Sequence, residues 1–138
     1  MRAVIVSLLV AASVASASET ANFWGTWEPR PMLREFWRPV TEKWWSCNKR
    51  DECGPDLRLR NRCEKFARTH SPEVAVPEFI ADLGVYASEA NELVYFSIMA
   101  HWPRHTVLRI LESLRHSPDP GTRNIIEETL EDYREFRQ

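Results

Sequence analysis

The sequence predicts an all-α protein, a small irregular bundle of about five helices with an aromatic, proline-rich N-terminal extension held by one disulfide. Apolar residues recur at three- and four-residue spacing through the C-terminal part of the chain, as on the buried faces of helices. Prolines and helix-capping residues separate these segments. Because no glycine-rich hairpin or sustained alternation of apolar and polar residues is present, we expect no strands.

Residues 1–17 are predicted to be a cleaved export signal. One cation, Arg2, precedes an apolar run from Ala3 to Ala12. Small residues at Ala15 and Ala17 form the A-x-A pattern of a cleavage site, so we expect cleavage after Ala17. The predicted location of the mature protein is therefore secreted or extracellular.

Two alternatives to a cleaved signal are open. A retained membrane anchor needs about 20 apolar residues, whereas the stretch from Ala3 to the polar Ser18 reaches only about 15. A mitochondrial presequence needs several arginines on one helical face, and Arg2 stands alone in this segment. The alternative location is therefore membrane-associated or mitochondrial.

The rest of the chain divides into an aromatic Pro/Arg-rich segment, residues 18–55, and a helical domain, residues 56–138. Five of the six tryptophans lie between residues 19 and 45. We expect this segment to pack on the domain and to form short helices over residues 31–37 and from Thr41 towards Asn48. A proline opens the first of these helices, at a position where its missing N–H is not needed.

The first long helix of the domain is expected to begin after a cap at Asp56 and to run to about Thr69, with Leu59, Cys63 and Phe66 on one face. A loop is then predicted at Ser71–Pro72. The next helix is expected to open at Pro77 and to end at Gly84, since glycine is the usual residue at a helix C-terminus.

Three further helices are predicted towards the C-terminus. Ser88 caps one that Pro103 stops, and the next presents an apolar stripe between Val107 and Leu114. After a turn, Thr122 is expected to cap the last helix. The residues expected on its inner face are Ile126, Leu130, Tyr133 and Phe136.

Three cysteines, Cys47, Cys53 and Cys63, lie close together in the sequence. In an oxidising compartment two should pair and one is left over, but spacing alone does not choose the pair. A bond from Cys63 to either of the others would fasten the aromatic segment to the first long helix and add about 2–4 kcal/mol. The odd thiol is either free or links two chains into a disulfide-bonded dimer.

Charge is unevenly distributed along the chain, although the net charge is only −2. Residues 30–68 carry an excess of lysine and arginine, whereas residues 69–103 contain acids and no cation. The two parts are expected to neutralise each other on folding, and the alternative is a basic surface that faces a partner. The overall balance gives no reason to expect binding to nucleic acid.

No nucleophile motif, metal signature or nucleotide-binding loop is present. The most suggestive constellation is His101-Trp-Pro-Arg-His105, but Pro103 separates the two histidines and no third ligand is evident. We therefore predict a non-catalytic protein without metal or cofactor.

The aromatic segment is the best candidate for a binding site, because arginine and tryptophan dominate binding hot spots. The alternative is that most of these rings complete the core of a small domain. The predicted contact residues are Trp24, Trp27, Arg30, Arg34, Trp37 and Arg38.

These observations predict a small secreted helical protein that binds a protein partner in an effector, signalling or carrier-like role. The alternative is an accessory subunit of a membrane-bound complex, with residues 3–17 retained as an anchor. Contact with a membrane is expected only in that second case.

Overall fold

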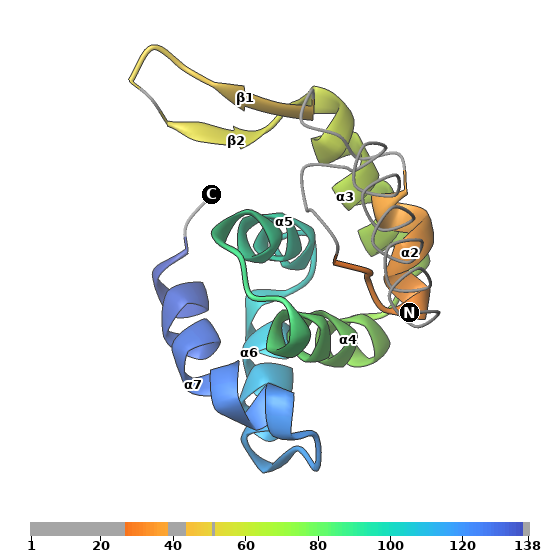
Figure 1. The fold of residues 1–138 in the computed structure, drawn as a ribbon, viewed down its shortest axis with the longest axis vertical. Helices are drawn as coiled ribbons and strands as arrows, with labels where there is room; N and C mark the ends of the chain where they lie inside the picture. Colours follow the sequence, from red (N-terminus) through yellow and green to blue (C-terminus); the bar gives the residue numbers. More distant parts are fainter. Residues whose placement is uncertain (1–26, 39–43, 51, 137–138) are drawn as a thin grey trace, which may run out of the picture.

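The computed structural model describes residues 27–38, 44–50 and 52–136, and in this part of the chain it is predominantly helical (Figure 1). The described residues form six α-helices, a short 3₁₀ helix and a two-stranded hairpin. The small all-α bundle with one disulfide is confirmed, whereas the expectation of no strands is wrong. The elements are α2 (Pro31–Trp37), β1 (Trp45–Cys47), β2 (Cys53–Pro55), α3 (Leu57–Thr69), α4 (Pro72–Val85), α5 (Glu89–Met99), α6 (Arg104–Ser113), η2 (Leu114–His116) and α7 (Pro120–Glu135).

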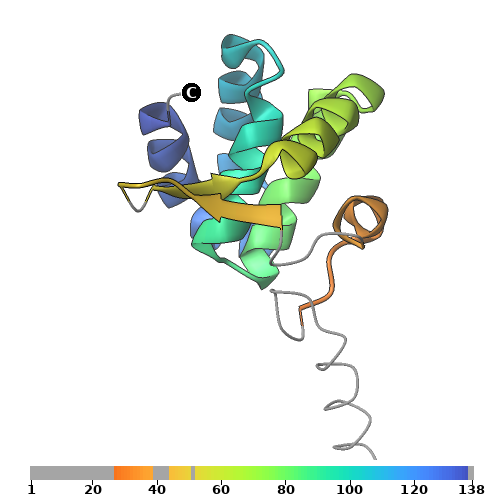
Figure 2. The same ribbon diagram turned by 90° about the horizontal axis from the view of Figure 1, so that it is seen from above.

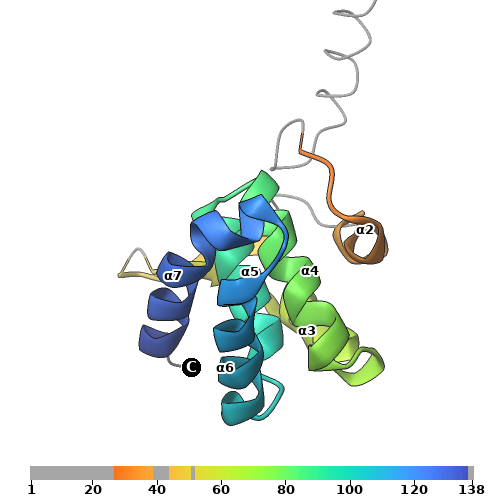
Figure 3. The same ribbon diagram turned by 90° about the horizontal axis from the view of Figure 1, so that it is seen from below.

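Helix α4 is central and packs against α5, α6 and α7, while α3 packs against α5. Helices α2 and α3 lie on one side of this group and α7 lies on the other (Figures 1 and 3). All six helices contribute to one hydrophobic core. Its largest fully buried side chains are Trp37, Tyr95, Tyr133, Phe79, Leu33, Leu59, Ile80, Leu83, Ile98, Met99, Leu111 and Ile126.

Helix α3 begins as the sequence predicts. The Asp56 carboxylate accepts a hydrogen bond from the Leu59 backbone N–H at 3.0 Å, and Leu59, Cys63 and Phe66 form the buried face. The predicted Ser88 cap of α5 is also present, since its hydroxyl accepts from the Asn91 backbone N–H at 3.0 Å. These caps satisfy backbone donors that have no partner within the helix.

The predicted cap of α7 is wrong by three residues. Asp119, not Thr122, is the capping residue, and the helix begins at Pro120. One carboxylate oxygen of Asp119 accepts from both the backbone N–H and the hydroxyl of Thr122, each at 2.8 Å. Aspartate caps well, and proline at the first helical position fits this earlier start.

Helix α4 begins five residues before its predicted start at Pro77. Pro72 opens the helix, so no loop separates Ser71–Pro72 from Pro77, which lies inside it. An interior proline costs about 3 kcal/mol because it removes a hydrogen bond and crowds the preceding turn. Burial of a large apolar side chain contributes about 1.5–3 kcal/mol, so the face containing Phe79 and Leu83 outweighs that cost.

The prediction that α4 ends at Gly84 is wrong, because the helix continues to Val85. Its backbone lies against that of Gly121 at the start of α7. A Cβ atom on Gly84 would lie 2.7 Å from the Gly121 carbonyl carbon, which is closer than packed atoms tolerate. The two glycines therefore let α4 and α7 approach each other closely.

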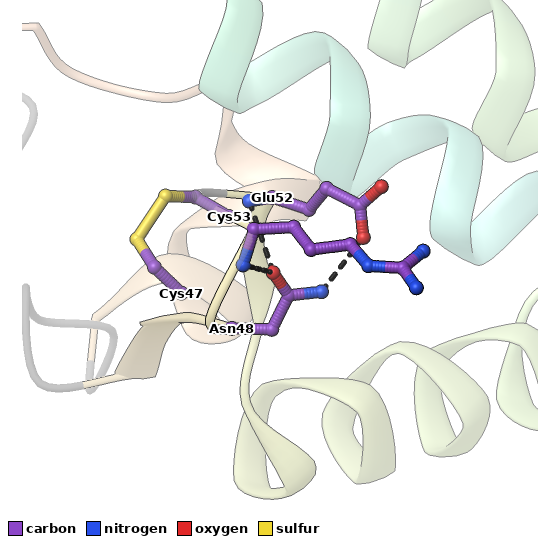
Figure 4. The surroundings of a disulfide bond; sticks show 5 residues. Cys47, Asn48, Glu52 and Cys53 are labelled. Atoms are coloured by element: carbon purple, nitrogen blue, oxygen red, sulfur yellow. Dashed lines mark hydrogen bonds between the residues drawn. A yellow bond between two sulfur atoms is a disulfide. The ribbon is translucent and has the colours of Figure 1, made fainter.

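The helix expected from Thr41 towards Asn48 is wrong where the structure describes it, and residues 41–43 lie outside the described part. Trp45–Cys47 is a strand that pairs antiparallel with Cys53–Pro55. The two strands are separate segments of the chain, so the spacing of residues within either segment does not reveal their pairing. A disulfide between Cys47 and Cys53 closes the loop between them (Figure 4). Figure 2 shows this hairpin crossing one end of the helices, with its tip projecting past them.

The disulfide lies within the hairpin and does not link it to α3. Cys63, the third cysteine, is free and fully buried in α3, and burial raises the pKa of its thiol to about 12. The alternative bond from Cys63 to Cys47 or Cys53 is therefore not formed. A disulfide-linked dimer through Cys63 would require α3 to move away from the core.

Candidate functional site

A buried polar network attaches the segment around α2 to the helical body. The Trp37 indole N–H donates to the Tyr95 hydroxyl at 3.1 Å, and that hydroxyl donates to the carboxylate of Asp82. The backbone N–H of Arg30 donates to the other Asp82 oxygen at 3.2 Å. Burial raises the pKa of the Asp82 carboxyl, whose side chain lies within the core. Asp82 therefore joins both ends of this segment to α4 and α5.

The structure places the described tryptophans of the predicted site in the core. Trp37 is 1% exposed and Trp27 is 9% exposed. Trp27 stacks on Tyr86 with ring centroids 5.4 Å apart, and it meets Trp37 edge-on at 5.4 Å. Trp24 lies outside the described residues. The rings of Trp27 and Trp37 thus occupy the positions expected if the aromatic segment completes the core.

The three arginines of the predicted site face two directions. Arg30 turns towards α4, where its guanidinium lies 3.8 Å from Glu78. Arg34 and Arg38 are exposed and lie one helical turn apart on the outer side of α2. The structure therefore separates Arg30 from Arg34 and Arg38.

A groove of about 480 Å³ runs along the outer side of α2, and we call it the α2 groove. Arg34 and Arg38 line it, together with Trp37, whose side chain is otherwise buried in the core. Three of the six predicted contact residues thus meet at one concave surface. Its remaining lining residues are Pro29, Pro31 and Glu35.

Arg62 holds the C-terminal end of α2 in place. One guanidinium nitrogen donates to the backbone carbonyls of Glu35 at 2.7 Å and Phe36 at 2.8 Å. Such carbonyls have no partner within their own helix, so the guanidinium caps α2. The same guanidinium lies over the rings of Phe36 and Trp44, each 5.7 Å from the ring centroid.

Sequence reasoning missed the contribution of α3 to this surface. Arg58 also lies over Trp44, at 5.2 Å, and Arg58, Arg62 and Lys65 follow one another at helical spacing. We call these three residues the basic stripe of α3. Their spacing of four and three residues was the signal that could have revealed them.

Neutralisation between the basic and acidic parts of the chain is limited in the described residues. Arg30 and Glu78 form the ion pair that joins residues 30–68 to residues 69–103 there. Other ion pairs of the basic part, such as Arg58 with Asp56, are local. Within the described ranges no carboxylate pairs with Arg38, Lys49, Arg50, Arg60, Arg62 or Lys65.

On the opposite side, α5 and α7 bring carboxylates together around a cavity of about 460 Å³. Burial, followed by the charge of Asp132, raises the pKa of Glu92 to about 7. Glu89 and Glu128 also line this cavity. The surface between α5 and α7 is therefore acidic, whereas α3 carries an excess of cations.

The histidines and the free thiol form no assembled reactive site in the described part of the chain. His70 stacks on Phe66, with ring centroids 3.9 Å apart, at the end of α3. His101 and His105 flank the break between α5 and α6. Among the described residues, no group of three or more His, Cys, Asp or Glu side chains is arranged to hold a metal ion.

The chain matches no protein-family model, no curated protein and no solved structure in the comparisons made with each. Within the described ranges, every helix is too short or too polar to cross a membrane. The disulfide between Cys47 and Cys53 indicates an oxidising environment.

Proposed function

We propose that this is a secreted, non-catalytic protein that binds an acidic segment of a protein partner through the α2 groove. The observation that carries the proposal is that Arg34 and Arg38 line the same groove along α2. Export is supported by the residue pattern of residues 1–17 and by the disulfide of the hairpin.

The α2 groove is preorganised for binding. The Asp82 network fixes the start of α2, and Arg62 caps its end. A surface that is already ordered loses less conformational entropy when a partner binds, so more of the contact free energy appears as affinity.

Charge supports an acidic occupant, because two arginines and one acid, Glu35, line the α2 groove. Arg34 pairs only loosely with Glu28, since both side chains are more than half exposed, and such pairs contribute about 0–1 kcal/mol. Arg38 has no carboxylate partner in the described residues, and the basic stripe of α3 lies beside the end of α2. Arginine suits this role because its planar guanidinium binds carboxylates in a bidentate manner.

The first experiment tests export. The intact mass of the protein purified from its native source should correspond to a chain that begins at Ser18. A mass that includes Met1 to Ala17 contradicts secretion and favours the anchored accessory subunit.

The second experiment tests the groove with paired charge reversals. The mature domain and its Arg38→Glu, Arg34→Glu/Arg38→Glu and Arg109→Glu variants are used to capture proteins from the secreted fraction. Arg109, an exposed arginine on α6 that lies outside the groove, is the matched control.

We expect the wild type and Arg109→Glu to bind the partner with equal affinity. The double variant Arg34→Glu/Arg38→Glu should bind it at least about tenfold more weakly. The affinity of the partner should also fall as salt is added, because the contact is between exposed charges. Equal loss in Arg38→Glu and Arg109→Glu contradicts a role for the groove.

A further inference from the structure

A second groove, of about 560 Å³, lies beneath the disulfide hairpin on the opposite side of α3 from the basic stripe. Strand β2, α3, α5 and the residue that follows α7, Phe136, all line it. We call it the hairpin groove. Its volume falls within the range of roughly 300–1,000 Å³ that is typical of small-molecule sites.

Two arginines hold in place chain segments that line or adjoin the hairpin groove. Arg60 donates from Nε to the carbonyl of Pro55 at 3.1 Å, which holds β2 against the start of α3. Arg104 donates to the carbonyls of Tyr133 at 3.1 Å and Arg134 at 2.8 Å, and its guanidinium lies over the Tyr133 ring. The end of α7 is therefore tied to the start of α6, and the groove is present before any ligand enters.

The interior of the groove is mainly apolar. Leu93 and Pro55 line it, and Phe136 packs on Phe96 with ring centroids 5.4 Å apart. Cys63 also contributes, and because burial raises the pKa of its thiol to about 12, this side chain is uncharged at neutral pH. Such a lining favours an alkyl chain or another apolar body.

The polar groups at the rim favour a negative charge on the ligand. Arg60 has no carboxylate partner in the described residues, and its terminal nitrogens make no hydrogen bond there. The His101 side chain makes none in the same ranges. Glu64 is the one acid in the lining, and its carboxylate is already paired with Arg68.

We propose that the hairpin groove binds a small amphipathic carboxylate, with its alkyl chain against Leu93 and Phe136 and its carboxylate on Arg60 and His101. This site is distinct from the α2 groove and does not depend on the proposed protein partner. It gives the protein a carrier or ligand-sensing activity in addition to protein binding.

The test measures binding of decanoate to the mature domain by titration calorimetry, with decylamine as a ligand of similar chain length and opposite charge. We expect saturable binding of one decanoate and much weaker binding of decylamine. Arg60→Met and His101→Phe should each weaken decanoate binding at least about fivefold, since each removes a donor to the carboxylate. Arg109→Met, on α6 and outside the lining of the groove, should leave the affinity unchanged.

A cavity-filling variant, Leu93→Trp, should abolish binding while the helical circular dichroism signal is retained. If Leu93→Trp does not fold, the affinities of the Arg60 and His101 variants for decanoate decide the outcome. The proposal is overturned if decanoate gives no saturable signal up to its solubility limit. It is equally overturned if decylamine binds as tightly, or if Arg60→Met binds decanoate as tightly as the wild type and Arg109→Met do.

Discussion

At the scale of single residues, attachment of the α2 segment depends on polar atoms buried in the core. Tyr95 stands between Trp37 and Asp82, accepting from one and donating to the other. A buried polar atom that loses its partner retains the full cost of desolvation. The hydroxyl of Tyr95 therefore contributes more to stability than its size suggests.

Replacing Tyr95 by phenylalanine should lower the free energy of unfolding by about 1–3 kcal/mol, because it removes the hydroxyl that donates to one Asp82 oxygen and accepts from the Trp37 indole N–H. Urea denaturation measures the change. Tyr86→Phe is the control, since no hydrogen bond of its hydroxyl is present in the described residues, and its effect should stay within about 0.5 kcal/mol. Equal effects of the two substitutions would show that the network does not hold α2.

The raised pKa of Glu92 predicts how the free energy of unfolding depends on pH. Its pKa rises from an ordinary value of 4.5 to about 7 in the folded protein, so the folded state binds a proton more tightly than the unfolded state does. The free energy of unfolding must then fall as pH rises from about 4.5 to about 7. Burial and the carboxylate of Asp132 are the causes.

Glu92→Gln should flatten this fall, since glutamine remains neutral throughout, and it should make the protein more stable than the wild type above neutral pH. Urea denaturation at a series of pH values and constant ionic strength measures the slope. Glu131→Gln, an exposed substitution on α7, is the control. A slope unchanged by Glu92→Gln would place the titrating group elsewhere.

At the scale of helices and strands, the contact between α4 and α7 is set by two glycines. Alanine favours a helix over glycine by about 1 kcal/mol, so propensity alone predicts that Gly84→Ala stabilises α4. The contact with Gly121 predicts the reverse, because the added Cβ would meet backbone atoms that cannot move aside.

Gly84→Ala should therefore lower the free energy of unfolding by about 1–3 kcal/mol, the usual cost of forcing extra atoms into a packed interior. Thermal and urea denaturation both measure this. Gly54→Ala, in the hairpin, provides the contrast because nothing lies within 4 Å of its added Cβ. Stabilisation by Gly84→Ala would mean that the two helices are less closely packed.

The elements that sequence predicts well are those whose signals are local. The caps at Asp56 and Ser88, the break at Pro103 and the buried face of α3 all follow from neighbouring residues. The hairpin could not be predicted in this way, because it pairs two separate segments of the chain. The spacing of the three cysteines does not show that Cys47 bonds to Cys53 across these segments. Pro77 misleads for a similar reason, since tertiary burial outweighs its local cost.

The predicted contact residues also combine features that local sequence reveals with features that depend on tertiary packing. The sequence identifies an aromatic, arginine-rich segment, but the exposure of each ring depends on packing against α4 and α5. Trp37 is enclosed because its indole N–H has a buried partner in Tyr95. The outward direction of Arg34 and Arg38 follows from the buried positions of Leu33 and Trp37 on the same short helix.

At the scale of the whole molecule, opposite charges gather on opposite sides. Figure 3 shows α2 and α7 on opposite sides of the molecule. The basic stripe and the α2 groove belong to α3 and α2, and the carboxylates around Glu92 line a cavity formed by α5 and α7. A net charge near zero therefore conceals two strongly charged surfaces. For the acidic partner that we propose, such a distribution would orient its approach towards the α2 groove and raise the rate of productive encounters.

The most direct test of the binding proposal is photo-cross-linking from position 35. A photoreactive residue replaces Glu35, an exposed residue in the lining of the α2 groove, in one protein and Arg109 in a control, and each is exposed to the secreted fraction. Mass spectrometry should identify a cross-linked partner peptide rich in Asp and Glu from position 35 and none from position 109. Equal cross-linking from both positions, or a cross-linked peptide without acidic residues, would contradict the proposal.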